Sequence, residues 1–308
     1  MPIIDNVGYC DYGDFLRRYF DCKVQKIAID AGFACPNRDG TKGVGGCIYC
    51  NNQSFNPAYC QTKISVAEQI ARGKEFFARK YPEMKYLAYF QAYTNTYAQL
   101  STLKELYEEA LRQSDVLGII IATRPDCMPD ELLTYLSELS KTHFVMVEYG
   151  VETSHDATLK LINRGHTWAD VEDAVTRTAE AGVLCGAHLI LGLPGEDMEH
   201  FIATAKRISA LPLHTVKMHQ LQVIRGTRLA KMWTDGEVVL KDWSADEYID
   251  VCIEVLKHLR SDLAVERFVS QSPADLLICP RWGLKNYEFT NRLNNKIKAQ
   301  RIRQGSDA

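Results

Sequence analysis

The sequence lacks several features that would define its class at once. Its 308 residues contain no apolar run of about 20 residues that could cross a membrane, and the first residues hold neither a basic region nor an apolar signal core. Only 10 prolines and 19 glycines are present, which excludes collagen-like and proline-rich chains. We therefore expect a globular, cytoplasmic protein that makes no contact with a membrane.

A dominant charge of one sign is also missing. The 36 Lys and Arg residues nearly balance the 39 Asp and Glu residues. Without an overall positive field, nucleic acid could be held only by a local patch. The C-terminal end is such a patch, with Trp282 and Tyr287 interleaved among charges, and it could contact RNA through phosphates and stacking or be an ordinary solvated helix. Its basic residues outnumber the acidic Glu288 and Asp307, and they are Arg281, Lys285, Arg292, Lys296, Lys298, Arg301 and Arg303.

Short apolar runs alternate with amphipathic helical patterns along most of the chain. The runs are rich in Ile, Val and Leu, which is typical of parallel strands covered by helices on both faces. Six of them predict strands, namely Val24–Asp30, Tyr86–Phe90, Leu117–Thr123, Phe144–Val151, Gly186–Gly192 and Thr215–Val223. The pattern predicts an α/β fold, a partial (β/α)6 TIM-like barrel over residues 24–226, because the remaining chain is too short for the two further units of a closed barrel.

Helix boundaries can be read between and after these strands. Thr102 and Glu105 have capping-box spacing, Asp130 is a candidate N-cap, and Gly182 is a natural helix stop. Ser244, three residues before a glutamate, predicts another capped helix. We interpret residues 1–23 as an N-terminal segment. Residues 227–308 are interpreted as a C-terminal α/β extension with a strand over residues 263–269 and the basic tail.

What the chain does have is ten cysteines. In a reducing cytosol they should not form structural disulfides. Cys35, Cys47 and Cys50 lie in a glycine-rich loop after the first expected strand, with the spacing C-x11-C-x2-C, where α/β barrels place their chemistry. Three thiolates could hold three irons of a [4Fe–4S] cluster, whereas zinc would want a fourth ligand such as Cys60, and inert thiols are a third possibility. Packing is expected for the other seven, which are Cys10, Cys22, Cys60, Cys127, Cys185, Cys252 and Cys279.

Further motifs follow the cysteine loop, each at the end of an expected strand. Arg164 lies twelve residues after Glu152. The motifs are Phe90-Gln-Ala-Tyr-Thr-Asn-Thr96, Ala122-Thr-Arg-Pro-Asp126, Gly150-Val-Glu-Thr153, Leu191-Gly-Leu-Pro-Gly-Glu196 and Leu221-Gln-Val-Ile-Arg-Gly-Thr227. This ordered set resembles the radical SAM superfamily, in the branch of the elongator-complex catalytic subunit and the oxygen-independent coproporphyrinogen oxidases. The usual family spacing is C-x3-C-x2-C, and the glycines of the usual turn after the second strand are absent here.

The resemblance implies a [4Fe–4S] cluster on the three cysteines and S-adenosylmethionine (SAM) as the cofactor. One electron from an external donor of the flavodoxin or ferredoxin type would cleave SAM, and the resulting 5′-deoxyadenosyl radical would abstract a substrate hydrogen. The backbone near Ala92, Tyr93 and Thr94 would receive the cofactor amine. Glu152 would bind the ribose, Arg164 the carboxylate, and the turn containing Leu193 would lie against the adenine.

The substrate is open at this stage. The elongator-type resemblance implies transfer RNA and wobble-uridine modification, whereas the coproporphyrinogen-oxidase resemblance is compatible with a small metabolite or a porphyrin-like molecule. A non-catalytic zinc-binding scaffold is the alternative from another class. Further polar candidates are His166 and His188, and the sixth expected strand carries residues that could line a substrate cavity, namely His219, Gln220 and Gln222.

Overall fold

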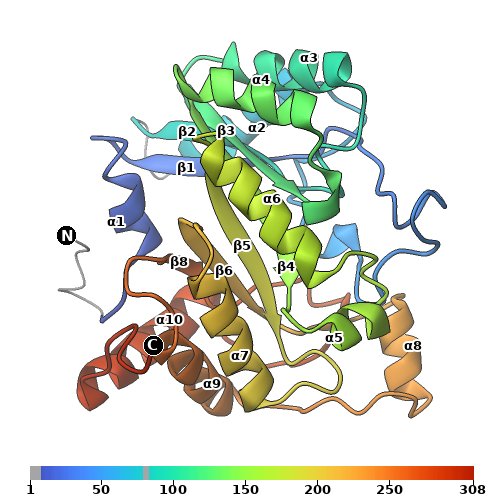
Figure 1. The fold of residues 1–308 in the computed structure, drawn as a ribbon, viewed down its shortest axis with the longest axis vertical. Helices are drawn as coiled ribbons and strands as arrows, with labels where there is room; N and C mark the ends of the chain where they lie inside the picture. Colours follow the sequence, from blue (N-terminus) through green and yellow to red (C-terminus); the bar gives the residue numbers. More distant parts are fainter. Residues whose placement is uncertain (1–7, 79–82) are drawn as a thin grey trace.

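The computed structural model describes residues 8–78 and 83–308 (Figure 1). Seven parallel strands form one sheet in the order β1-β2-β3-β4-β5-β6-β8, which curls into a partial barrel. Their bounds are Val24–Ile29 (β1), Lys85–Phe90 (β2), Val116–Thr123 (β3), Phe144–Glu152 (β4), Leu184–Leu191 (β5), Thr215–Gln220 (β6) and Ala264–Arg267 (β8). The predicted α/β partial barrel is confirmed, and β8 adds a seventh strand beside β6.

Helices cover the outer face of the sheet, as Figure 1 shows for α4 and α6. None of the helices in the described part of the chain is long and apolar enough to cross a bilayer. The longer helices are Val66–Ala78 (α2), Leu100–Leu111 (α3), Asp130–Ser140 (α4), Trp168–Glu180 (α6), Met198–Ser209 (α7), Ala245–Lys257 (α9) and Asn286–Gln300 (α10). Shorter elements are Tyr12–Leu16 (α1), Asn52–Ser54 (η1), Pro125–Cys127 (η2), Asp156–Leu161 (α5) and Arg228–Thr234 (α8).

Alternation along the strands separates two environments. In β3, Ile119 and Ile121 belong to the large core beneath the helices, whereas Ile120 and Ala122 point into the barrel. The amino end of the barrel is closed by α1, whose Phe15 lies in the same apolar cluster as Phe144 of β4. Because this end is filled by apolar side chains, the interior is open toward the carboxyl ends of the strands.

Strand β6 ends earlier than expected. It was predicted to reach Val223, but the parallel ladder ends at Gln220, and Val223–Ile224 form a separate strand, β7. This strand pairs in antiparallel fashion with β9, which spans Leu277–Cys279. Where the chain leaves the barrel, the side chain of Gln222 bonds to the segment around Ser270.

Two of the expected helix caps are also placed differently. The N-cap of α3 is Gln99, so Thr102 lies within the helix and the capping box predicted there is wrong. Asp130 is the first residue of α4 and not its cap. By contrast, Ser244 forms the predicted capping box with Glu247, and Gly182 follows α6 with a φ of 74°.

The basic C-terminal end is packed against the rest of the protein. The Trp282 ring lies 5.2 Å from the Tyr248 ring, and its indole N–H donates to the carbonyl of Trp243. The Trp282 ring is therefore not free to stack on a base, whereas Tyr287 is 59% exposed. Helix α10 faces acidic residues of α9, because Lys296 lies 2.5 Å from Asp250 and Arg292 lies near Asp246.

We expect the two capping-box sequences to respond differently to mutation. Ser244→Ala removes the hydroxyl that accepts from the Glu247 N–H and should lower the free energy of unfolding by about 1 kcal/mol. Thr102→Ala should be neutral or slightly stabilising, because Thr102 is exposed inside a helix. Thermal unfolding of the two variants beside the wild type checks this, and equal losses in both would contradict it.

Candidate active site

A cavity of about 370 Å³ lies at the carboxyl ends of the strands and extends into the barrel. It brings together most of the residues predicted from the sequence, and these are Cys35, Cys47, Cys50, Tyr93, Thr94, Glu152 and Arg164. Two predicted residues do not line it. Ala92 is fully buried, and the Leu193 side chain packs in an apolar cluster with Ile48 and Ile162.

The cysteine loop is held in place by the turn that follows α5. The side-chain amide of Asn37 donates to the carbonyl of Asn163 at 2.5 Å and to the sulfur of Cys47 at 3.6 Å. In return, the Asn163 amide donates to the carbonyl of Gly46 at 2.8 Å. Two segments more than 100 residues apart in sequence are thereby fixed side by side.

Arg164 lies at the centre of this arrangement. Its guanidinium donates to the sulfur of Cys47 at 3.6 Å and to the carbonyl of Gly150 at 2.7 Å, and it lies 3.4 Å from the Glu152 carboxylate. A side chain at Gly150 would collide with it, because a Cβ there would be 2.4 Å from the guanidinium. Burial raises the pKa of Glu152, and the charge of Arg164 acts in the opposite direction.

The backbone is strained at two of the predicted residues. Tyr93 after β2 has a φ of 60°, and Glu152 at the end of β4 has a φ of 67°. Residues other than glycine seldom adopt a positive φ, and such strained backbone clusters at functional sites. The turn at Tyr93 therefore has the conformation that glycine would favour although it contains no glycine.

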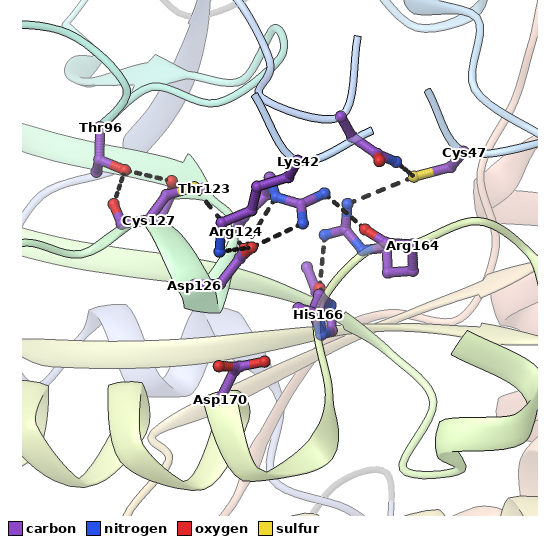
Figure 2. A network of polar contacts seen from close by, with 12 residues as sticks. Lys42, Cys47, Thr96, Thr123, Arg124, Asp126, Cys127, Arg164, His166 and Asp170 are labelled. Atoms are coloured by element: carbon purple, nitrogen blue, oxygen red, sulfur yellow. Dashed lines mark hydrogen bonds and ion pairs between the residues drawn. The ribbon is translucent and has the colours of Figure 1, made fainter. Parts of the chain in front are cut away.

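A buried ion pair supports the cysteine loop and Arg164 together (Figure 2). The Arg124 guanidinium binds the Asp126 carboxylate with two bonds of 2.9 Å and donates to the carbonyl of Arg164 at 2.7 Å. Lys42 of the cysteine loop reaches the same carboxylate at 2.6 Å. Although burial acts to raise it, these cations lower the pKa of Asp126 to about 2. In the sequence, Asp126 was only the last residue of the motif Ala122-Thr-Arg-Pro-Asp126.

Other candidates lie outside the cavity. The His166 ring lies 3.1 Å from the Gly150 carbonyl, and burial together with the charge of Arg164 lowers its pKa to about 2. It is a buried neutral group that contacts the backbone (Figure 2). Burial, with Asp30 nearby, raises the pKa of the Cys60 thiol to about 12, and Cys60 does not line the cavity.

The deeper part of the cavity carries charges that sequence reasoning missed. Glu148 of β4 bonds to Lys26 at 2.6 Å, to Lys217 at 2.7 Å and to His188 at 2.7 Å. Burial alone would raise the pKa of Glu148, but Lys217 and Lys26 lower it well below its ordinary value. The sequence did contain a sign of this network, because a charged residue lies within each of three predicted strands: Lys26, Glu148 and Lys217.

His188 of β5 lines this cavity, and so do both of the adjacent residues His219 and Gln220 of β6, where alternation predicts only one of the two. Burial and the charge of Lys217 lower the pKa of His188 to about 4. The amide of Gln220 is held by two hydrogen bonds to the backbone of Ser270, of 2.9 and 3.0 Å. Gln222 also lines the cavity.

A larger cavity, of about 760 Å³, lies outside the barrel between the cysteine loop, η2 and α6. It contains Lys42 and Asp126 but none of the three clustered cysteines. The cavity within the barrel is therefore the candidate active site.

The fold and the site define a partial α/β barrel with a three-cysteine loop at its open end. The family model described as Radical SAM superfamily matches residues 35–208, and the model described as Radical_SAM C-terminal domain matches residues 213–299. The chain belongs to the radical SAM superfamily, whose members are enzymes that use a [4Fe–4S] cluster and SAM and need an external electron donor.

Similar proteins extend this result. The uncharacterised protein YtqA of Bacillus subtilis is 36% identical over 290 residues, which cover 94% of this chain and 89% of that protein. The tRNA uridine(34) acetyltransferase of Methanocaldococcus jannaschii is 29% identical over 198 residues, 61% of this chain and 35% of that enzyme. The solved structure of Methanocaldococcus infernus Elp3 shares the fold, with a TM-score of 0.69 at 18% identity, over 92% of this chain and 64% of that one.

The Arg124–Asp126 pair should be a strong determinant of stability. Asp126→Asn leaves the guanidinium buried without a carboxylate and should lower the free energy of unfolding by about 3–5 kcal/mol. Asp130→Asn breaks an ion pair with Arg177 in which the aspartate is exposed, and should cost about 1 kcal/mol or less. Chemical denaturation of both variants measures the difference, and a loss in Asp126→Asn no larger than in Asp130→Asn would contradict the assignment.

Proposed function

We propose that Cys35, Cys47 and Cys50 hold a [4Fe–4S] cluster, and that the cavity beside them binds SAM for reductive cleavage. The observation that carries this proposal is the convergence of the cysteine loop with Arg164 and Glu152 in one cavity. Two N–H groups point at the Cys47 sulfur, from Asn37 and from Arg164, and hydrogen bonds to the ligand sulfurs are one of the means by which a protein sets the potential of a cluster.

The residues present fit a cluster and a polar cofactor. Within the described residues, the three sulfurs do not form a group whose members all lie within 4.8 Å of one another, whereas zinc at about 2.3 Å from each sulfur would draw them closer than that. The Nε of Arg164 and the hydroxyl of Thr94 are buried at the cavity without a protein partner. These groups would supply hydrogen bonds to a ligand with polar substituents.

Each residue then has a defined task. Arg164 would pair with the cofactor carboxylate through its planar guanidinium, Glu152 would accept from the ribose hydroxyls, and the turn at Tyr93 and Thr94 would receive the amine. The turn containing Leu193 would contribute backbone near the adenine. When bound, the reduced cluster supplies the electron that cleaves SAM and yields a 5′-deoxyadenosyl radical for hydrogen abstraction. The electron would come from a flavodoxin or ferredoxin type of donor.

We further propose transfer RNA, modified at the wobble uridine, as the substrate. Relatives named tRNA uridine(34) acetyltransferase support this proposal. At the mouth of the cavity Phe55 is 42% exposed and Tyr93 is 39% exposed. The guanidinium of Arg38 lies 5.6 Å from the Tyr93 ring. Exposed aromatic rings beside arginine are suited to stacking on unpaired bases. The exposed Tyr287 of the basic C-terminal end, beside Lys285, is a second place where RNA could stack. A small polar metabolite is the second candidate, favoured by the charged interior.

The cluster ligands can be tested by a matched pair of cysteine variants. After anaerobic iron reconstitution, wild type should hold about four irons and produce 5′-deoxyadenosine from SAM when reduced. Cys47→Ala should lose cofactor cleavage, and Cys60→Ala should retain it because Cys60 lies outside the cavity. Cleavage retained in Cys47→Ala, or a colourless wild-type protein holding one zinc, would overturn the proposal.

The RNA substrate can be tested separately in cells. Deletion of the gene should remove one modified wobble uridine from hydrolysed transfer RNA, as measured by mass spectrometry of the nucleosides. Complementation with wild type should restore it, and complementation with Cys47→Ala should not. An unchanged set of nucleosides after deletion would remove the RNA proposal and leave the small metabolite.

A further inference from the structure

The deeper part of the cavity is built from inward-facing side chains of six strands, which we call the barrel floor. Its members are Lys26 of β1, Tyr89 of β2, Glu148 of β4, His188 of β5, Lys217 and His219 of β6, and Glu266 and Arg267 of β8. Most of these residues line the same cavity as the three cysteines. Along β4, Glu148 lies four residues before Glu152, about 13 Å along the strand. Arg267 is nearer the strand ends, because the register of β5, β6 and β8 places it level with Gly150.

The lysines and glutamates of the barrel floor neutralise one another. Lys26 lies 2.6 Å from Glu148 and 2.5 Å from Glu266. Lys217 lies 2.7 Å from Glu148 and 3.2 Å from Glu266, and it donates to the Tyr89 hydroxyl at 3.1 Å. Each lysine therefore contacts both carboxylates. The two positive charges balance the two negative charges, so the glutamates do not neutralise a further cation.

Arg267 is the cation left over. Within residues 8–78 and 83–308, no carboxylate lies at ion-pair distance from it, and its Nε is buried without a hydrogen-bond partner. One of its terminal nitrogens lies 3.1 Å from Nε2 of His219. Burial and the charge of Arg267 lower the pKa of His219 well below its ordinary value, so this ring adds no charge of its own.

The position of Arg267 is fixed from both sides. Its strand pairs with β6, where Lys217 is its register partner. Just after the strand, the backbone of Ser270 exchanges two hydrogen bonds with the Gln220 side chain. An arginine held in this way loses little further freedom when it binds a ligand, and its planar fork matches an oxyanion.

We propose that the barrel floor is an oxyanion subsite, in which Arg267 binds a carboxylate or phosphate group of the molecule that undergoes hydrogen abstraction. The inference rests on the proposed function, because it assigns another part of the same cavity. It defines the substrate class: the reacting molecule carries an anionic group that reaches Arg267 on β8, level with Gly150 of β4. Lys26 and Lys217 keep Glu148 and Glu266 from competing for Arg267.

The test uses the full-length protein with its reconstituted cluster, under anaerobic conditions and at constant ionic strength. Sodium acetate and inorganic phosphate are titrated in separate calorimetric experiments as probes of the two oxyanion chemistries. We expect saturable binding of at least one, weakened about tenfold or more in Arg267→Gln, since one charge-assisted hydrogen bond contributes on that scale. The anion that binds more tightly identifies the group that the substrate carries.

Two further variants make the result specific. Arg225→Gln removes an exposed cation outside the cavity, whose guanidinium bonds to the carbonyl of Asp275, and should leave anion affinity unchanged. Arg267→Lys keeps the charge but loses the fork and should bind several-fold more weakly than wild type. If Arg267→Gln does not fold, as judged by iron content and thermal unfolding, Arg267→Lys is compared with wild type in its place.

The outcomes separate this inference from the proposed function. Absence of saturable binding in wild type, or equal affinity in wild type and the Arg267 variants, overturns the oxyanion subsite even if SAM is cleaved. Conversely, a wild-type protein that shows Arg267-dependent anion binding but does not cleave SAM contradicts the proposed function and leaves the subsite standing.

Discussion

The contact of the Arg164 guanidinium with the Cys47 sulfur is the interaction on which the arrangement of the site depends. It ties a loop that follows β1 to the end of β4. Arg164 is in turn held through its own carbonyl by Arg124, and Arg124 is held by Asp126. The glycine-rich loop becomes a defined cavity wall because these buried charges, together with the hydrogen bonds that Asn37 and Gly46 of the loop make with Asn163, fix its position.

Burial of charge is the general constraint in this barrel. The apolar end closed by α1 excludes water, so charged side chains above it must find partners within the protein. Glu148 meets this requirement with two lysines and a histidine. The same requirement makes Arg267 informative, because its Nε is buried without a hydrogen-bond partner although the residue as a whole is partly exposed, and a ligand oxyanion would satisfy it.

Local signals were sufficient for the framework of the molecule. Buried parallel strands need Ile- and Val-rich runs, and real capping boxes such as that of Ser244 follow from nearest neighbours, so these elements could be predicted. The spacing of the cysteines also placed them in one loop at the correct end of the sheet. The capping box predicted at Thr102 was wrong because α3 begins earlier, at Leu100, where no side chain caps the helix.

The rest of the site could not be predicted because it depends on pairs that are distant in sequence. Lys26 and Glu148 are 122 residues apart, and only barrel closure brings them together. The positive φ of Tyr93 is imposed by the surrounding turn, since the residue type disfavours it. Likewise, the Trp282 ring packs against Tyr248. The basic residues around Trp282 in the sequence gave no indication of this contact.

The interior of the barrel draws on both regions that the family models match. Glu152 and Arg164 belong to the region of the superfamily model, whereas Lys217 and Arg267 belong to the region of the C-terminal domain model. Because Glu148 of the first region contacts Lys217 of the second, the two regions share one buried ion-pair network. A charge-changing substitution in either region therefore has to be matched by a change in the other.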